Sequence, residues 1–164
     1  MSAKARFMAR QLRFTFVDRS VSGLVDLYEE HAPRTCETIW GALASPIRVP
    51  AIHAIYSGPE IMVGLPESAQ TFDPRSIPNE NQSVIPAPGD VLWFYQAPNL
   101  MKGLADEFWE IGLFYGEGGR IFGPMGWLPV NFFARMRHED LAAFAAECRD
   151  IRLTGAKTLE ISRA

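Results

Sequence analysis

Apolar and polar residues alternate along much of this chain, which is the pattern of short, half-buried β-strands. Leu12, Phe14 and Phe16 alternate with polar neighbours and predict a first strand, and a second strand follows from Val21. Apolar runs bounded by glycine or proline predict further strands at 48–56, 60–65, 91–95, 107–115, 120–122 and 127–136. We expect 107–115 and 120–122 to form a hairpin around the glycine-rich turn between them.

Two other segments carry the apolar spacing of helices. The first begins at Pro33, a favoured first-turn residue, and ends before Pro46. Its apolar stripe repeats at helical intervals and consists of Cys36, Ile39, Trp40 and Leu43. The second helix begins near 139–140, ends at Gly155, and has an apolar face made of Leu141, Phe144, Ala145 and Cys148. A final strand at 158–161 completes the order strand, helix, many strands, helix, strand.

This order predicts a mainly β protein, a closed or nearly closed β-barrel with two α-helices. The chain has 164 residues, which suits one domain, and we expect that domain over 12–164. Residues 1–11 are basic, lack the apolar stretch of a secretory signal and are expected to be a flexible leader. Met8 is an alternative to Met1 as the start. The proline-rich segment 66–88 is expected to be a long loop, which in a compact domain is often functional.

Composition excludes several classes of partner. A net charge of −3 argues against binding to nucleic acid, and no apolar run is long enough to cross a membrane. The two cysteines fall on apolar helix positions, which indicates buried thiols in a reducing cytoplasm. The three histidines are scattered and do not have the spacing of metal ligands, so no metal and no cofactor are expected.

Several short motifs, in order along the chain, resemble a known fold family. The segment 32–35 reads Ala-Pro-Arg-Thr, 53–58 begins with histidine and ends with glycine, and 80–82 reads Glu-Asn-Gln. The segment 88–90 reads Pro-Gly-Asp, and 126–134 reads Gly-Trp-Leu-Pro-Val-Asn-Phe-Phe-Ala. Together they are similar to a bacterial family of cyclophilin-like proteins with no assigned function, which is distantly similar to cyclophilin prolyl isomerases. The resemblance implies a cyclophilin-like barrel.

The same resemblance argues against proline isomerisation. In cyclophilins a Phe-His-Arg strand supplies the catalytic arginine, and the matching triplet here is Ile52-His53-Ala54. The alanine side chain cannot donate the hydrogen bond that the arginine provides. We therefore expect no active prolyl isomerase.

Two polar residues within apolar strands are the first candidates for a binding site. His53 shares a strand face with Ala51 and is either a core histidine bonded to a backbone carbonyl or a pocket histidine near neutrality. Glu110 shares a face with Phe108 and Gly112. It is either paired with an arginine, exposed on an edge strand, or a carboxyl whose pKa is raised by burial.

The remaining candidates lie on strands and in the long loop. Glu80 and Asn81 form either a polar turn or ligand contacts over the barrel mouth. Trp93 and Tyr95 share a strand face and are either core or a stacking wall for a planar ligand. The full predicted site is His53, Tyr56, Glu60, Glu80, Asn81, Trp93, Tyr95, Glu110 and Asn131.

These residues favour a protein that binds a small organic molecule or short peptide in the barrel mouth. One alternative is a hydrolase of amides or cyclic amides, with His53 or a glutamate as general base and Asn131 polarising a carbonyl. The analogy behind it is that cyclophilin-like domains also occur in amide-hydrolysing and oxoproline-handling enzymes. Another is a non-catalytic interaction module or homo-oligomer subunit with exposed edge strands and a detachable C-terminal segment.

Overall fold

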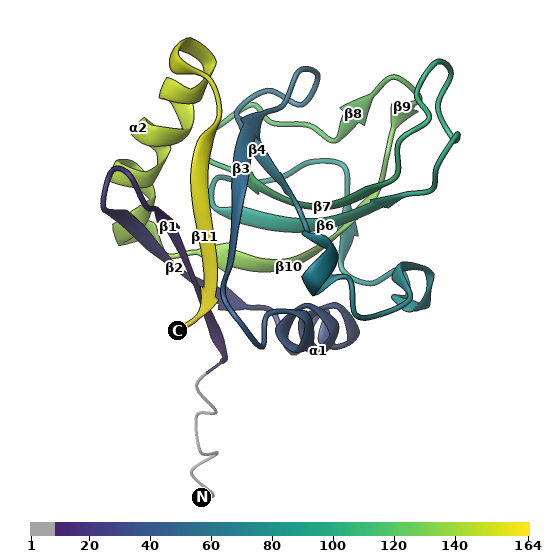
Figure 1. Cartoon of the computed structure of the whole chain (residues 1–164), viewed down its shortest axis with the longest axis horizontal. Helices are drawn as coiled ribbons and strands as arrows, with labels where there is room; N and C mark the ends of the chain where they lie inside the picture. Colours follow the sequence, from purple (N-terminus) through teal and green to yellow (C-terminus); the bar gives the residue numbers. More distant parts are fainter. Residues whose placement is uncertain (1–8) are drawn as a thin grey trace, which may run out of the picture.

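The computed structural model describes residues 9–164, which form eleven strands, two α-helices and two short 3-10 helices (Figure 1). The helices are α1 (Pro33–Ala42) and α2 (His138–Thr154), with 3-10 turns η1 (Glu67–Ala69) and η2 (Pro74–Ser76). The strands are β1 (Gln11–Phe16), β2 (Val21–Leu27), β3 (Ile47–His53), β4 (Glu60–Gly64), β5 (Gln82–Ser83), β6 (Asp90–Gln96), β7 (Phe108–Phe114), β8 (Phe122–Gly123), β9 (Gly126–Trp127), β10 (Val130–Met136) and β11 (Lys157–Arg163).

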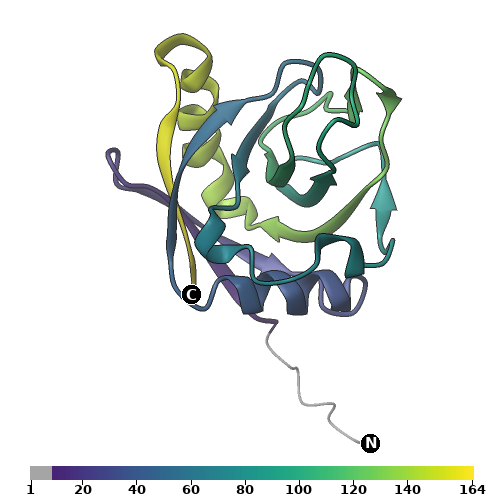
Figure 2. The same ribbon diagram turned by 45° about the vertical axis from the view of Figure 1, so that its right-hand side comes forward.

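Eight of the strands close into an antiparallel barrel. The main sheet runs in the order β2-β1-β11-β3-β4-β7-β6-β10-β5, and β2 also pairs with β10. That extra pairing joins the two sides of the sheet and leaves the short β5 at its edge, as the turned view makes visible (Figure 2). The structure therefore confirms the predicted mainly β barrel with two helices.

The two helices pack on the barrel at different places. Helix α1 lies below the barrel in Figure 1 and packs on β10, where the Cys36 thiol donates to the Phe133 carbonyl at 3.2 Å. Helix α2 packs against β2 and β3, and its Phe144 ring lies 4.6 Å from the Phe16 ring in the core. Both cysteines are buried, as predicted, and burial raises the pKa of the Cys36 thiol to about 12. Neither described helix is long and apolar enough to span a membrane.

The barrel wall formed by β4, β7 and β6 has apolar side chains on both of its faces. Ile61, Ile111 and Trp93 point inward and belong to the main core. Leu92 and Phe94 point outward and belong to a second apolar cluster. Side chains alternate across a strand, so a wall that is apolar on both faces needs a cover on its outer side. The β8–β9 hairpin, which is a separate two-stranded sheet, lies over that outer face (Figure 1).

The expected hairpin between 107–115 and 120–122 is wrong. Strand β7 pairs with β4 on one side and β6 on the other, so it has no free edge for a third partner. The short β8 instead pairs with β9. A glycine-rich turn signals a reversal of the chain but does not determine which strand follows as partner.

The predicted leader, long loop and C-terminal segment agree with the structure only in part. The expected leader over 1–11 lies mainly outside the described residues, and within it Gln11 begins β1. The expected loop over 66–88 is largely irregular but contains η1, η2 and β5. Strand β11 pairs with both β1 and β3, so the C-terminal segment is a central part of the wall and not a detachable hairpin.

Candidate functional site

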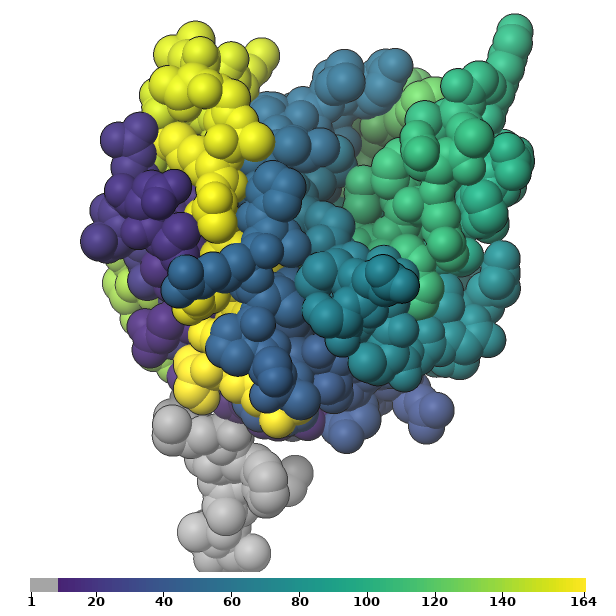
Figure 3. Space-filling view, in the orientation of Figure 1, coloured from purple at the N-terminus to yellow at the C-terminus, as the bar shows by residue number. Residues whose placement is uncertain are grey.

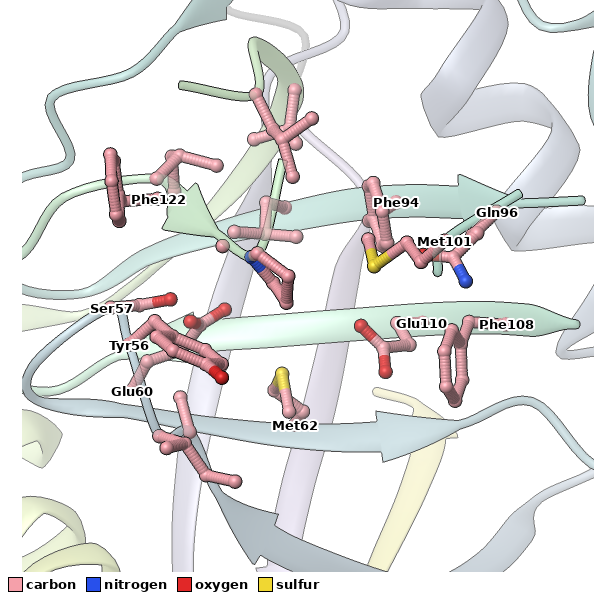
Figure 4. A pocket seen from close by; sticks show the side chains of 18 of the residues that line it. Tyr56, Ser57, Glu60, Met62, Phe94, Gln96, Met101, Phe108, Glu110 and Phe122 are labelled. Atoms are coloured by element: carbon pink, nitrogen blue, oxygen red, sulfur yellow. The ribbon is translucent and has the colours of Figure 1, made fainter. Parts of the chain in front are cut away.

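A cavity of about 270 Å³ lies on the outer face of the β4–β7–β6 wall. Its floor consists of the outward side chains of these strands, including Met62 and Phe94 (Figure 4). Its sides come from the 54–57 turn, the 101–104 segment and the β8–β9 hairpin. In the space-filling view the surface is hollowed between the residues near 55 and those near 100–110 (Figure 3). The cavity is therefore on the side of the barrel, not in its mouth.

Exposed apolar side chains surround the opening of this cavity. Ile55 is 87% exposed, and Ile52 and Tyr56 beside it are each 48% exposed. On the opposite rim Phe122 is 37% exposed. All four line the cavity. Large apolar side chains grouped around a concavity are typical of a binding surface, whereas single exposed ones are ordinary.

Glu60 is a buried carboxyl in the cavity wall and is only 4% exposed. Burial raises its pKa to about 8; Ser57 partly opposes this rise, and Glu110 adds to it. A β-carbon built on Gly112 would overlap the Glu60 Oε1 atom. The glycine therefore leaves the space that the Glu60 carboxyl occupies above β7.

Glu110 is the second carboxyl of the cavity. It lies on β7 opposite Phe94 of β6 and Gly64 of β4, and the cavity separates it from the hairpin. Removal from water raises its pKa to about 7. Within the described residues it forms no ion pair, so the expected arginine partner is absent there. Strand β7 is central in the sheet and Glu110 is only partly exposed, so the geometry favours the third interpretation, a carboxyl whose pKa is raised by burial.

Gln96 at the end of β6 was not predicted and is the third polar group facing the cavity (Figure 4). Its side chain is 0% exposed, and neither Oε1 nor Nε2 has a hydrogen-bond partner in the described chain. A buried amide without partners costs free energy, on the order of 1–3 kcal/mol, unless something else supplies the bonds. Gln96 is therefore the clearest sign that the cavity is a site for another molecule.

His53 lies away from the cavity. It points to the inner side of β3, where Nδ1 is 2.8 Å from the Ala54 carbonyl oxygen and Nε2 is 2.8 Å from the Tyr115 hydroxyl. Both ring nitrogens are satisfied by the protein itself. The structure therefore agrees with the interpretation of His53 as a structural histidine bonded to a backbone carbonyl.

Glu80, Asn81 and Asn131 tie the long loop to the barrel. The Glu80 carboxylate accepts from the Thr35 backbone N–H at 2.6 Å and from its hydroxyl at 2.7 Å, at the start of α1. The Asn131 amide donates to Thr35 Oγ1 and to the Pro78 carbonyl, and accepts from the Glu80 N–H. The Asn81 amide donates to the Phe132 carbonyl at 2.7 Å. These side chains use their hydrogen bonds within the protein and do not line the cavity.

Trp93 and Tyr95 belong to an aromatic group at the inner side of the wall. Trp93 lies 5.6 Å from Phe72 and 6.2 Å from Trp109, measured between ring centroids. Tyr95 packs edge-on against Trp109 and its hydroxyl donates to Glu107. These contacts are those of core packing, not of a wall facing a ligand.

Of the nine predicted residues, the structure therefore brings three into one cavity: Tyr56, Glu60 and Glu110. The side chains that sequence reasoning missed are mostly apolar and include Met62, Phe94 and Phe108, together with Gln96. A signal for them exists in the unbroken apolar run at 91–95, because a strand that is apolar on both faces must be covered on both. Among residues 9–164, no three His, Cys, Asp or Glu side chains gather closely enough to hold a metal ion.

The closed antiparallel barrel with two helices is the cyclophilin-like barrel fold that the motifs predicted. More specifically, the chain belongs to the family described as protein of unknown function DUF3830, whose model matches residues 14–163. A comparison with curated proteins gave no match.

Two solved structures share the fold. The structure of McbB in complex with tryptophan superposes with a TM-score of 0.65 at 17% identity, over 93% of this chain and 44% of McbB. This chain thus spans less than half the length of McbB. The solution structure of the hypothetical protein AF2241 from Archaeoglobus fulgidus superposes with a TM-score of 0.56 at 22% identity, over 99% of this chain and 100% of AF2241.

Proposed function

We propose that this protein binds a small organic molecule in the outer-wall cavity formed by β4, β7, β6 and the β8–β9 hairpin. The observation that carries the proposal is the buried, unpartnered amide of Gln96 at the wall of a mainly apolar cavity. An apolar concavity with a few converging polar groups is the usual form of a small-molecule site. The volume of about 270 Å³ lies just below the range of typical small-molecule pockets, about 300–1,000 Å³, and therefore suits a small ligand.

Ligand binding can be tested by filling the cavity. Ala54 lines it and is nearly buried, so Ala54→Phe places a ring in the space of the ligand. Ala143→Phe on the exposed side of α2 is the matched control. In a thermal-shift screen of metabolites, a ligand at 100 times its Kd stabilises by about 2.7 kcal/mol. In a domain of this size, that stabilisation raises Tm by roughly 5–10 °C.

We expect the wild type and Ala143→Phe to share the ligand-induced shift, and Ala54→Phe to lose it while keeping its far-UV circular dichroism. A ligand that shifts Tm equally in all three proteins binds elsewhere and contradicts the proposed cavity.

Proline isomerisation is not part of the proposal. Ala54 lines the cavity where the resemblance would place a catalytic arginine, and among the described residues no arginine lines it. In a protease-coupled assay of proline peptides we expect no turnover above the uncatalysed rate. Strong turnover that Ala54→Phe removes would contradict this expectation.

A hydrolase is the second candidate function, and the two cavity carboxyls favour it. A carboxyl with a pKa of about 7 or 8 can accept or donate a proton near neutral pH. His53 and Asn131 do not line the cavity, so the glutamates would be the acid and base. Turnover of amides that disappears in both Glu60→Gln and Glu110→Gln, and persists in Glu117→Gln, would establish this function.

A further inference from the structure

The charged residues that line the cavity are all acidic. The inference drawn from this rests on the proposed binding function. The titratable residues that line it are Tyr56, Glu60 and Glu110. Among the described residues, β4, β6, β7, the hairpin and the 101–104 segment place no lysine, arginine or histidine against it. The cavity thus presents two carboxyls and no positive group.

Neither carboxyl has a positively charged partner in the described part of the protein, and the Ser57 hydrogen bond offsets the burial of Glu60 only in part. Glu60 and Glu110 form no ion pair within residues 9–164, and the charged side chain that acts on Glu60 from the described residues is Glu110, which repels it. A buried carboxyl is normally either paired with a positive charge or protonated, because an isolated buried charge is costly. A positively charged ligand would supply the partner that lets the two cavity carboxyls ionise.

The two carboxyls lie on the same side of the wall and close enough for the charge of Glu110 to act on Glu60. The Glu60 carboxyl lies above Gly112, two residues along β7 from Glu110. At a strand rise of about 3.4 Å per residue, the backbone positions of Gly112 and Glu110 on β7 are roughly 7 Å apart. A planar guanidinium presents donors on opposite edges, and an ammonium presents three.

Gln96 adds a neutral acceptor beside Glu110. Gln96 of β6 is opposite Phe108 of β7. Two residues further along the same outward face, Phe94 of β6 is opposite Glu110 of β7, so Gln96 and Glu110 are diagonal neighbours. The unpartnered Oε1 of Gln96 can accept an N–H from a cation held by Glu110. Its Nε2 remains to donate to an oxygen of the same molecule.

We propose that the cavity selects an organic cation, an ammonium or guanidinium group carried on an apolar body, with Glu60 and Glu110 as its counter-charges and Gln96 as a further acceptor. The apolar body packs on Met62, Phe94 and Phe108, and the cationic group faces the carboxyls.

Binding of such a cation is linked to loss of protons. In the empty protein burial raises the pKa of Glu60 to about 8 and that of Glu110 to about 7, so both are largely or partly protonated at pH 6–7. Pairing with a cation favours the ionised forms and releases protons. Affinity therefore rises with pH up to about pH 8 and levels off above it.

The test uses three probes of similar size with the same phenylethyl body: 2-phenylethylamine, 2-phenylethanol and 3-phenylpropanoate. Calorimetry at pH 6, 7, 8 and 9, in buffers of different ionisation enthalpy, gives Kd and the number of protons released. At pH 8 we expect the amine to bind at least tenfold more tightly than the alcohol, and the acid to bind least. From pH 6 to pH 7 the amine should gain up to tenfold for each proton released.

Conservative substitutions of the two glutamates test whether their carboxyls cause the preference for the amine. Glu60→Gln and Glu110→Gln should each weaken binding of the amine at least fivefold and flatten its pH dependence, while affinity for the alcohol stays within twofold. Glu117→Gln, in an exposed turn, is the matched control and should behave as wild type. Benzylguanidine in place of the amine tells whether guanidinium is preferred.

The outcomes separate the two proposals. If none of the probes binds and the metabolite screen yields no ligand whose shift Ala54→Phe abolishes, the proposed binding function fails; if the screen yields such a ligand but the amine does not bind, only the selection of a cation fails. If the alcohol or the acid binds as tightly as the amine and Ala54→Phe blocks it, the binding function stands and selection of a cation is overturned. Amine affinity that does not change between pH 6 and pH 8, with no proton release, also overturns it.

Discussion

At the scale of single residues, Glu60 and Glu110 make the empty protein sensitive to pH. Their pKa values rise from 4.5 to about 8 and about 7 on folding, so the folded state holds protons that the unfolded state has lost. Where the folded state binds more protons, the free energy of unfolding falls as pH rises. The loss begins near pH 4.5 and is complete above about pH 8.

We therefore expect the free energy of unfolding to decrease between pH 5 and pH 8.5. One pKa unit corresponds to about 1.4 kcal/mol, so the decrease is on the order of several kcal/mol. Urea unfolding at pH 5, 7 and 8.5 measures it. Glu110→Gln should reduce the decrease and raise stability at pH 8.5, whereas Glu117→Gln should leave it unchanged. Equal pH dependence in wild type and Glu110→Gln would show that Glu110 ionises freely.

The residue scale also shows why the predicted site was only partly brought together. His53 and Asn131 attract attention because they are polar within apolar segments, but their partners, Tyr115 and Thr35, are 62 and 96 residues away. Such distant hydrogen bonds cannot be read from spacing along the chain. Glu60 and Glu110 carry the same kind of signal, and they differ because no described residue forms an ion pair with them.

At the scale of elements, the outward face of β7 is shaped by one glycine. A methyl group on Gly112 would overlap Glu60 Oε1 and lie 3.0 Å from Leu92 Cγ. Gly64 on the adjacent β4 has nothing within 4 Å of the corresponding position. The two strand glycines therefore form a matched pair for one substitution.

We expect Gly112→Ala to destabilise the protein by about 1–3 kcal/mol, since extra volume in a packed site forces shifts. It should also displace the Glu60 carboxyl and weaken amine binding. Gly64→Ala should be neutral or stabilising by up to about 1 kcal/mol. Urea unfolding measures both variants, and similar effects from the two would mean that crowding at Gly112 is relieved elsewhere.

Most elements were predictable, but their partners were not. The helix from Pro33 and the strands near 11–16, 21–27 and 60–64 follow from periodicity, because each needs only its own residues. The pairing of β7 with β4 depends on residues far apart in sequence, such as Ile61 and Leu113, which are 52 positions apart, and no local pattern encodes it. The same reason explains the wrong hairpin at 107–122.

At the scale of the whole molecule, the β8–β9 hairpin covers the cavity without belonging to the barrel sheet. Leu128 N–H donates to the Ile121 carbonyl at 3.2 Å, so these residues are already adjacent. A two-residue Asn-Gly turn, which suits antiparallel strands, could therefore replace 122–127. The segment contributes Phe122 and Pro124 to the cavity, while Met125 and Trp127 are exposed.

We expect this replacement to fold with a Tm only a few degrees lower, because little of the hairpin is buried. Ligand affinity should fall at least tenfold, since one side of the cavity is gone. Differential scanning calorimetry and calorimetric titration measure the two effects. Unchanged affinity would show that the hairpin plays no part in binding, and loss of folding would show that it supports the barrel.

The place of β11 in the wall has a consequence for how the chain reaches its native state. Its register joins Phe14 to Ile161, and β11 fills the gap between β1 and β3. Contacts of such high sequence separation have a large loop-closure entropy, and topologies dominated by them fold slowly, typically in milliseconds to seconds. Until those last residues dock, β1 and β3 expose unpaired edges, so the intermediate most prone to aggregation is a barrel that lacks this single strand.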